Sequence, residues 1–158
     1  MRPRPLALAL AAAAALTALP ACRGAEARPV RIVLSLYGAA GRPVHGLDVT
    51  VALPEGTRVA FDPATGRVAP EALALRPGAA GATLDGHFRP HASAPSIRIL
   101  LASTAPMRDG EVAAIDATVT SAVAPSVGRF EVARAAVSGP GGAGVPGATG
   151  WVSGVAPR

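Results

Sequence analysis

Residues 46–66 read G-L-D-V-T-V-A-L-P-E-G-T-R-V-A-F-D-P-A-T-G, and their pattern indicates the fold class. Its apolar residues fall on every second position at the start: Leu47, Val49, Val51 and Leu53. A period of two is typical of a strand with one buried face and one exposed face. Pro54 cannot donate a hydrogen bond to a neighbouring strand, so the predicted strand ends there.

The second half of this stretch repeats the pattern after a turn. Glu55 and Gly56 form the predicted turn, and residues 57–61 resume the alternation with Val59 and Phe61 in phase. Asp62-Pro63 and Gly66 then break the run. Two strands and two turns over residues 46–66 predict an antiparallel β unit.

The same alternation recurs along the chain. Strands are predicted over residues 30–37, 96–103, 111–120, 129–137 and 151–155. Residues 68–75 are predicted to form a strand or one short helical turn, and a short strand is predicted over 82–84. Val112 falls out of phase with Ile115, which predicts a β-bulge near the start of that strand.

Glycine and proline separate these segments. Loops or turns are predicted over 38–43, 76–86, 87–95, 105–110 and 124–128, with a long Gly/Pro-rich connection over 138–150. No helical period is found after the first 21 residues. We therefore predict an all-β fold, an antiparallel β-sandwich of about seven to nine short strands over residues 30–155, with 156–158 as a tail.

The N-terminus has the pattern of an export signal over residues 1–21. Arg2 and Arg4 form a basic start, and residues 6–19 are an uninterrupted Ala/Leu-rich run with one Thr. A membrane-spanning helix needs about 20 apolar residues, so this run is short for a span and normal for a signal peptide.

The end of that run, Leu19-Pro20-Ala21-Cys22, resembles the lipobox of bacterial lipoproteins. The resemblance implies cleavage between Ala21 and Cys22 and a lipid on the Cys22 thiol. Cys22 is the chain's single cysteine and stands where the motif needs it. Residues 22–29 would then form the lipidated tether, an anchor rather than a span. The alternative is an ordinary secretory signal followed by a chance cysteine.

Lipidation of Cys22 has two consequences. The mature domain would have no free thiol, which excludes a cysteine nucleophile, a thiolate metal site and a disulfide. In similar lipoproteins of Gram-negative bacteria, inner-membrane retention goes with Asp after the cysteine. Arg23 stands there, so the outer membrane is the favoured address if the source is Gram-negative.

The positive charge does not predict nucleic-acid binding. The 15 basic residues are all Arg, and removing Arg2 and Arg4 with the signal leaves 13 against 10 acidic residues. They are scattered singly at turns and outward strand positions, so they form no stripe. A solvated surface is the favoured interpretation.

One stretch carries a family resemblance. Residues 110–119, G-E-V-A-A-I-D-A-T-V, look like the cohesin pattern G-x-h-A-x-I-x-F-x-V, with Ala117 where that family usually has an aromatic residue. The diffuse similarity covers most of residues 30–155. It implies a nine-stranded jelly-roll sandwich, related in fold to some carbohydrate-binding modules. Cohesins are binding modules rather than enzymes, and they bind dockerins across one sheet face. No residue of that face can be assigned from the sequence.

The titratable residues predict no metal or cofactor site. His87 and His91 have a spacing that some metal sites use, but Pro90 lies between them, so they and His45 are predicted to be exposed loop histidines. Four acidic residues are predicted at turns without a calcium-loop pattern: Asp62, Asp85, Asp109 and Glu111.

The sequence also lacks the common catalytic signatures. Neither G-x-S-x-G nor H-E-x-x-H occurs, and no phosphate-binding glycine loop follows a strand. The glycines of residues 139–150 lack a strand-to-helix context and are predicted to be a connection. We therefore predict no catalytic residues and a protein that is not an enzyme.

The aromatic residues argue against sugar binding. The chain has three Phe, one Tyr and one Trp, and Phe61 and Phe130 are in phase with predicted core positions. Only Tyr37, Phe88 and Trp151 remain for a stacking surface, and Trp151 is predicted to cap the core. A carbohydrate-binding module is therefore the least favoured function. The favoured one is an envelope lipoprotein with a non-catalytic, protein-binding sandwich and a dockerin-like or assembly partner. The alternative is a structural accessory lipoprotein of an envelope or secretion assembly.

Overall fold

The computed structural model describes residues 25–90, 94–122 and 124–158. These residues form nine strands: β1 (Glu26–Tyr37), β2 (Val44–Ala52), β3 (Thr57–Arg58), β4 (Leu73–Leu75), β5 (Thr83–Arg89), β6 (Ser96–Met107), β7 (Gly110–Ser121), β8 (Glu131–Ser138) and β9 (Thr149–Pro157). Four short 3-10 turns connect them: η1 (Pro70–Ala72), η2 (Pro77–Ala79), η3 (Val127–Arg129) and η4 (Pro140–Gly142). In the described part of the chain, no helix is long and apolar enough to span a membrane. The predicted signal, Ala21 and Cys22 lie outside the described residues.

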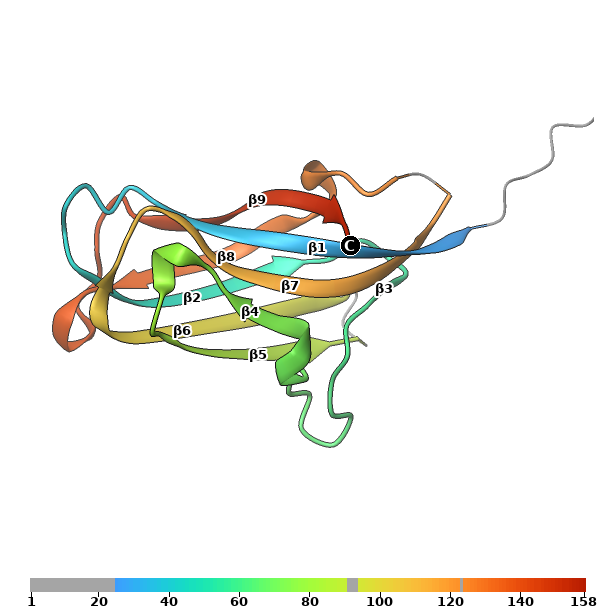
Figure 1. Cartoon of the computed structure of the whole chain (residues 1–158), viewed down its shortest axis with the longest axis horizontal. Coiled ribbons are helices and arrows are strands. Elements are labelled where there is room, and N and C mark those ends of the chain that lie inside the picture. The colour runs from blue at the N-terminus through green and yellow to red at the C-terminus, as the bar shows by residue number, and fades with distance from the viewer. Residues whose placement is uncertain (1–24, 91–93, 123) are drawn as a thin grey trace, which may run out of the picture.

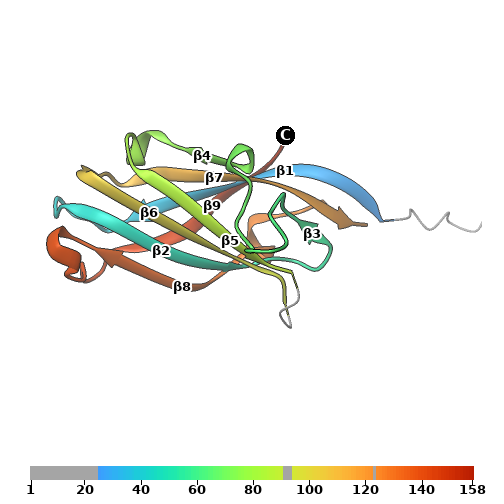
Figure 2. The same cartoon turned by 90° about the horizontal axis from the view of Figure 1, so that it is seen from below.

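The strands form two antiparallel sheets packed face to face. The five-stranded sheet has the order β3–β7–β1–β9, with β4 also paired to β7, and the four-stranded sheet has the order β5–β6–β2–β8. Figure 1 views the sandwich with the five-stranded sheet above, and Figure 2 shows the four-stranded sheet from below. The prediction of an all-β antiparallel sandwich is confirmed.

The core lies between the sheets and uses the predicted alternation. β1 turns four residues inward, each at most 3 % exposed: Val30, Ile32, Leu34 and Leu36. The four-stranded sheet contributes the inward-facing apolar residues of β2 and β6 to the same core: Leu47, Val49, Val51, Ile97, Ile99 and Leu101. Burying such a side chain stabilises the fold by about 1.5–3 kcal/mol, so this double layer is the main source of stability. All of it lies after residue 29, so a chain from Arg23 to Arg158 contains the complete sandwich.

The predicted antiparallel unit over residues 46–66 is wrong in its pairing. β2 lies in the four-stranded sheet, whereas β3 pairs with β7 in the other sheet. The turn at Glu55 and Gly56 carries the chain across the edge of the sandwich, where the Thr57 hydroxyl donates to the Pro54 carbonyl over 2.6 Å. Alternation predicts that both segments contain strands, although β3 ends at Arg58 instead of residue 61, and the neighbouring strand in sequence is not the partner in space.

Several strand boundaries also differ from the predictions. β9 extends from Thr149 to Pro157, so residues 156 and 157 pair with β1 and do not form the predicted tail. β1 begins at Glu26, so Glu26–Pro29 is paired with β7 instead of belonging to the tether. β5 runs through Arg89, where the sequence predicted a loop, and β6 continues to Met107, beyond the predicted end at Ser103. The backbone of residues 66–68 holds the end of β5 in strand form, because Phe88 N–H donates to the Gly66 carbonyl over 2.8 Å.

The β-bulge predicted at Val112 is confirmed. Leu34 of β1 faces Ala113 of β7, but the next residue, Ser35, faces Glu111. Val112 is therefore the extra residue, and it is fully buried. The bulge turns Val112 and Ala113 toward the core and lets Glu111 remain on the outer face.

Candidate functional site

The outer face of the four-stranded sheet carries two neighbouring rows of charge. One row, here the acidic row, runs across the strands through Asp85, Leu100, Asp48 and Ala136. The next row, the basic row, runs through His87, Arg98, Thr50 and Arg134. Directly paired residues share a face, so these side chains lie together on the surface that faces away from the core.

The two rows are joined by a bidentate ion pair at the centre of the sheet. The guanidinium of Arg98 donates from Nε to Asp48 Oδ1 over 2.9 Å and from Nη2 to Oδ2 over 2.7 Å. These hydrogen bonds lower the pKa of Asp48, against the opposing effect of its partial burial, and Arg134 adds to the lowering through its charge. The pair holds Arg98 against Asp48 of β2, and Arg134 is exposed on the neighbouring strand β8.

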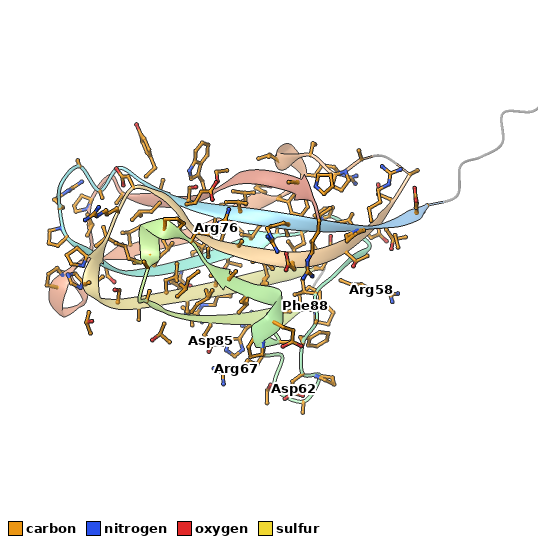
Figure 3. The ribbon with its side chains drawn as sticks, viewed as in Figure 1. Arg58, Asp62, Arg67, Arg76, Asp85 and Phe88 are labelled. Atoms are coloured by element: carbon orange, nitrogen blue, oxygen red, sulfur yellow. The ribbon has the colours of Figure 1, made fainter. Side chains whose placement is uncertain are left out.

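A second charged group lies on β5, toward the edge of the same face (Figure 3). Arg67 Nε donates to Asp85 Oδ1 over 2.9 Å, and His87 Nε2 lies 3.7 Å from Asp85 Oδ2. Burial by itself raises the pKa of Asp85, but the hydrogen bonds from Arg67 and from the Gly86 N–H lower it overall. Asp85 lies within a strand, so its predicted place at a turn is wrong, as is that of Glu111.

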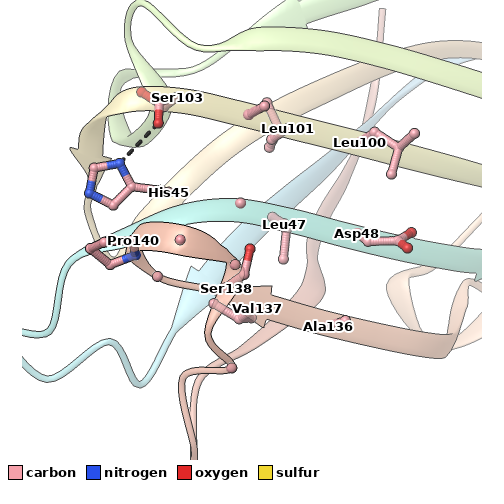
Figure 4. Close-up of a pocket in the computed structure, with 16 residues that line it drawn as sticks. His45, Leu47, Asp48, Leu100, Leu101, Ser103, Ala136, Val137, Ser138 and Pro140 are labelled. Atoms are coloured by element: carbon pink, nitrogen blue, oxygen red, sulfur yellow. Dashed lines mark hydrogen bonds between the residues drawn. The ribbon is translucent and has the colours of Figure 1, made fainter.

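The acidic row borders a groove at one end of the sheet, here called the sheet-end groove (Figure 4). Its volume is about 660 Å³. Small residues line the floor: Gly46, Ala102, Ala136 and Ser138. Gly46 faces Ala102 on one side and Ser138 on the other, and a Cβ at Gly46 would meet the Ser138 hydroxyl. The groove exists because three adjacent strands place small residues side by side.

The walls of the sheet-end groove are larger residues. His45 stands on one side and is held by a hydrogen bond of 2.9 Å between Nδ1 and the Ser103 carbonyl. Pro140 stands above the floor as part of η4, and Leu100 closes the groove toward the centre of the sheet. The groove is therefore mainly apolar, with the Asp48 carboxylate at one margin.

The loop that carries Pro140 is folded back against β8. Gly139 N–H donates to the Ala143 carbonyl over 2.7 Å, and Val145 N–H donates to the Val137 carbonyl over 3.0 Å. Gly141 and Gly142 both have positive φ angles, 68° and 83°, which favour glycine. The Gly/Pro-rich connection predicted over 138–150 thus forms a defined wall of the groove.

The histidines do not lie where the sequence placed them. His45 is part of β2 and partly buried, and His87 is part of β5, so the prediction of exposed loop histidines is wrong for both. His91 lies outside the described residues. Within residues 25–90, 94–122 and 124–158, no group of three or more His, Cys, Asp or Glu side chains is placed to hold a metal ion.

The aromatic residues are divided between core and surface differently from the prediction. Phe88, labelled in Figure 3, is only 4 % exposed. It packs against Phe61, with ring centroids 5.1 Å apart and planes at 73°. Phe130 is buried, as predicted. Trp151 is 51 % exposed, so it does not cap the core. Its neighbours Gly150 and Val152 face inward, and the alternation of β9 turns Trp151 outward.

The sequence did not predict the sheet-end groove or the two charged rows beside it. The floor of the sheet-end groove is made of Gly, Ala and Ser, residues that carry no motif, and only the cross-strand register brings them together. No family model matches this chain, and no match is found among curated proteins or among solved structures.

Proposed function

We propose that this chain is an exported envelope lipoprotein whose sandwich is a non-catalytic module that binds a protein partner through the outer face of the four-stranded sheet. The observation that carries the proposal is the sheet-end groove beside the two charged rows. An apolar recess next to a flat polar surface suits a protein partner, because one side chain can fill the recess while charges set the orientation.

The chemistry of this face restricts the partner. Asp48 is already engaged by Arg98, whereas Arg134 on β8 is exposed and acts on Asp48 through its charge. We expect the partner to carry an apolar side chain that enters the groove and a carboxylate that meets Arg134. The cohesin resemblance of residues 110–119 agrees with binding across a sheet face, and it is part of the proposal.

The position of the groove fits a chain anchored at Cys22. Only three residues separate Cys22 from the start of β1, so an anchor there would hold Glu26 within about 14 Å of the lipid attachment. The groove lies at the other end of the sandwich, beside η4, far from the point where β1 begins (Figure 1). A lipid at Cys22 would thus leave the groove pointing away from the bilayer, which we propose to be the outer membrane of a Gram-negative source.

The test is capture of a partner by the chain from Arg23 to Arg158. This bait is incubated with an envelope extract of the source organism, and bound proteins are identified by mass spectrometry and then titrated. We expect one saturable partner. Ala136→Arg, which fills the groove floor, and Arg134→Glu, which reverses the exposed charge, should each weaken binding at least tenfold.

Ala64→Arg is the matched control, because it adds the same charge at an exposed turn away from the groove. It should bind as the unaltered chain does. Equal binding by all variants would remove the groove from the proposal. Recovery of several envelope proteins together, with none binding alone, would favour the structural accessory role instead.

A further inference from the structure

Two aromatic side chains stand exposed on the outer face of the five-stranded sheet. Tyr37 of β1 is 67 % exposed and Trp151 of β9 is 51 % exposed. The other aromatic residues of the chain, Phe61, Phe88 and Phe130, are buried or packed against the core. Exposed aromatic rings present a large apolar surface, so two of them on one face form a candidate surface for a ligand.

The strand register places the two rings as near neighbours. Tyr37 faces Thr149, and Trp151 faces Ser35, so Tyr37 and Trp151 occupy diagonal positions on adjacent antiparallel strands. Diagonal positions lie about 7–8 Å apart, within reach of aromatic side chains. Both residues point away from the core because their neighbours Leu36 and Val152 are buried. One ligand can therefore contact both rings.

A row of hydrogen-bonding groups lies beside the rings. Ser35 faces Trp151 on one side and Glu111 on the other. Arg76 reaches over β7 and donates to Glu111 Oε2 from Nη2 over 2.8 Å and from Nε over 3.0 Å. Both partners of this ion pair remain about a third to a half exposed, with 34 % and 49 % of their side chains accessible. Figure 3 shows Arg76 on the sheet that carries β1 and β7, away from the charged group at Asp85.

The surface between the two aromatic rings and the Arg76–Glu111 pair is low and polar. Ser35 is only 5 % exposed although it points outward, because larger side chains flank it. Its hydroxyl lies 2.7 Å from the Ser153 hydroxyl. The face therefore has a low centre of small hydroxyl residues. The two aromatic rings of β1 and β9 lie on one side of it, and the Arg76–Glu111 pair lies on the other.

We propose that this face binds a neutral saccharide, with its sugar rings on Tyr37 and Trp151 and its hydroxyls on the Arg76–Glu111 pair and Thr149. A pyranose ring with equatorial substituents presents a flat C–H surface that stacks on an aromatic face, while its rim of hydroxyls both donates and accepts hydrogen bonds. The residues present match both parts. Arg76 donates, Glu111 accepts, and their charges cancel, so an uncharged ligand is favoured over an anionic or cationic one.

A protein partner fits this face less well than a sugar does. The energetic centre of a protein interface is an apolar cluster from which water is excluded by surrounding contacts. Here the two rings are surrounded by hydroxyls and an ion pair, and Val33 beside them is already buried. The site is also separate from the sheet-end groove, which lies on the opposite sheet.

Trp151 provides the direct readout, because it is the only Trp of the chain. The chain from Arg23 to Arg158 is titrated with cellohexaose and with chitohexaose while Trp151 fluorescence is recorded, and calorimetry measures the same binding. Co-sedimentation with purified peptidoglycan sacculi tests the polymer. We expect saturable binding to at least one of these three probes, seen as a change in Trp151 emission for the soluble sugars and as co-sedimentation for the sacculi.

Four variants locate the site. Trp151→Ala and Tyr37→Ala should each weaken binding at least tenfold, and Trp151→Phe, which keeps a planar ring, should retain part of it. Glu111→Gln should weaken it less, since it keeps an acceptor. Val127→Ala is the control, because it removes another exposed apolar side chain, 39 % exposed, outside the site. Circular dichroism melts of all variants separate lost binding from lost folding.

Ala136→Arg should leave saccharide binding unchanged, so the two proposals fail independently. Absence of binding to all three probes at millimolar concentration by the folded chain would overturn the saccharide site. Binding that survives Trp151→Ala would do the same. Capture of a protein that Trp151→Ala abolishes would assign this face to a protein partner instead.

Discussion

Single residues decide how this sandwich responds to acid. Asp116 of β7 accepts from Arg31 Nε over 2.8 Å and lies 3.3 Å from Arg158 Nη1, so it joins β7, β1 and the C-terminal residue. The hydrogen bond from Arg31 is the largest cause of its lowered pKa, with burial opposing and both Arg charges supporting the shift. The outward alternation of β1 predicts that Arg31 is exposed, but only the cross-strand register identifies Asp116 as its partner.

Asp116→Asn should lower stability at neutral pH and much less in acid. A pKa that is depressed in the folded state stabilises the fold above the unfolded value of about 3.9, and this contribution is lost as pH falls through the folded value. For this partly exposed pair we expect a loss of about 1 kcal/mol at pH 7. Urea unfolding at pH 7 and pH 3 measures it. Equal losses at both pH values would contradict the assignment, and Glu55→Gln at an exposed turn is the control.

Trp151 should behave as an exposed chromophore in the native protein. Because about half of its side chain is accessible, acrylamide should quench its fluorescence efficiently before unfolding, and denaturation should change its emission little. Circular dichroism is therefore the better probe of folding. A native Trp151 that acrylamide reaches only after unfolding would contradict the exposed position on β9.

At the scale of elements, the two sheets pack closely against each other at one glycine of β9. Gly150 of β9 faces inward, and a Cβ there would lie 2.6 Å from Val49 Cγ2 and 3.1 Å from Leu47 Cδ1 of the opposite sheet. Gly150→Ala should destabilise the fold by about 1–3 kcal/mol, the usual range for overpacking. Gly154→Ala on the same strand is the matched control, because its Cβ would lie 3.6 Å from Val33 in ordinary contact. Chemical denaturation compares the two, and equal stabilities would refute the close packing.

The first four residues of β1 should contribute to stability. Glu26–Pro29 pairs with Thr118–Ser121 of β7, and the Pro29 carbonyl accepts from the Arg158 N–H over 3.3 Å. A chain that begins at Val30 should unfold at a temperature several degrees lower than one that begins at Glu26, corresponding to about 1–2 kcal/mol. Thermal melts of both chains test this. Equal melting temperatures would mean that residues 26–29 act only as a tether.

At the scale of the whole molecule, the proposed lipid anchor at Cys22 precedes the sandwich in the chain. Cys22→Ser should release the chain from the membrane fraction and abolish incorporation of labelled palmitate, since the thiol is the proposed lipid site. Fractionation of cells that express each form makes the comparison. Pro20→Ala, which keeps Cys22, is the control. A Cys22→Ser chain that remains in the membrane pellet would contradict the lipidation.

The sequence by itself determined the fold class and most strands, because alternation is local. The apolar phase of residues 47–53, 97–101 and 115–119 fixes which side chains face inward, and an out-of-phase Val112 was enough to predict the bulge. These features depend on neighbours two residues apart along the chain, so they can be read without knowing the partner strand.

Only the tertiary structure decided which strands pair and which residues meet. The alternation of residues 46–66 predicted one antiparallel unit, yet β2 and β3 belong to different sheets. Both sheets face the same core, so each strand can bury its apolar side chains without pairing with the other. The same non-local pairing assembled the sheet-end groove from β6, β2 and β8. It also turned Tyr37 and Trp151 outward side by side, although 113 positions separate them in the chain. Contacts between distant residues depend on sheet order and register, and hydrophobic periodicity carries no information about either.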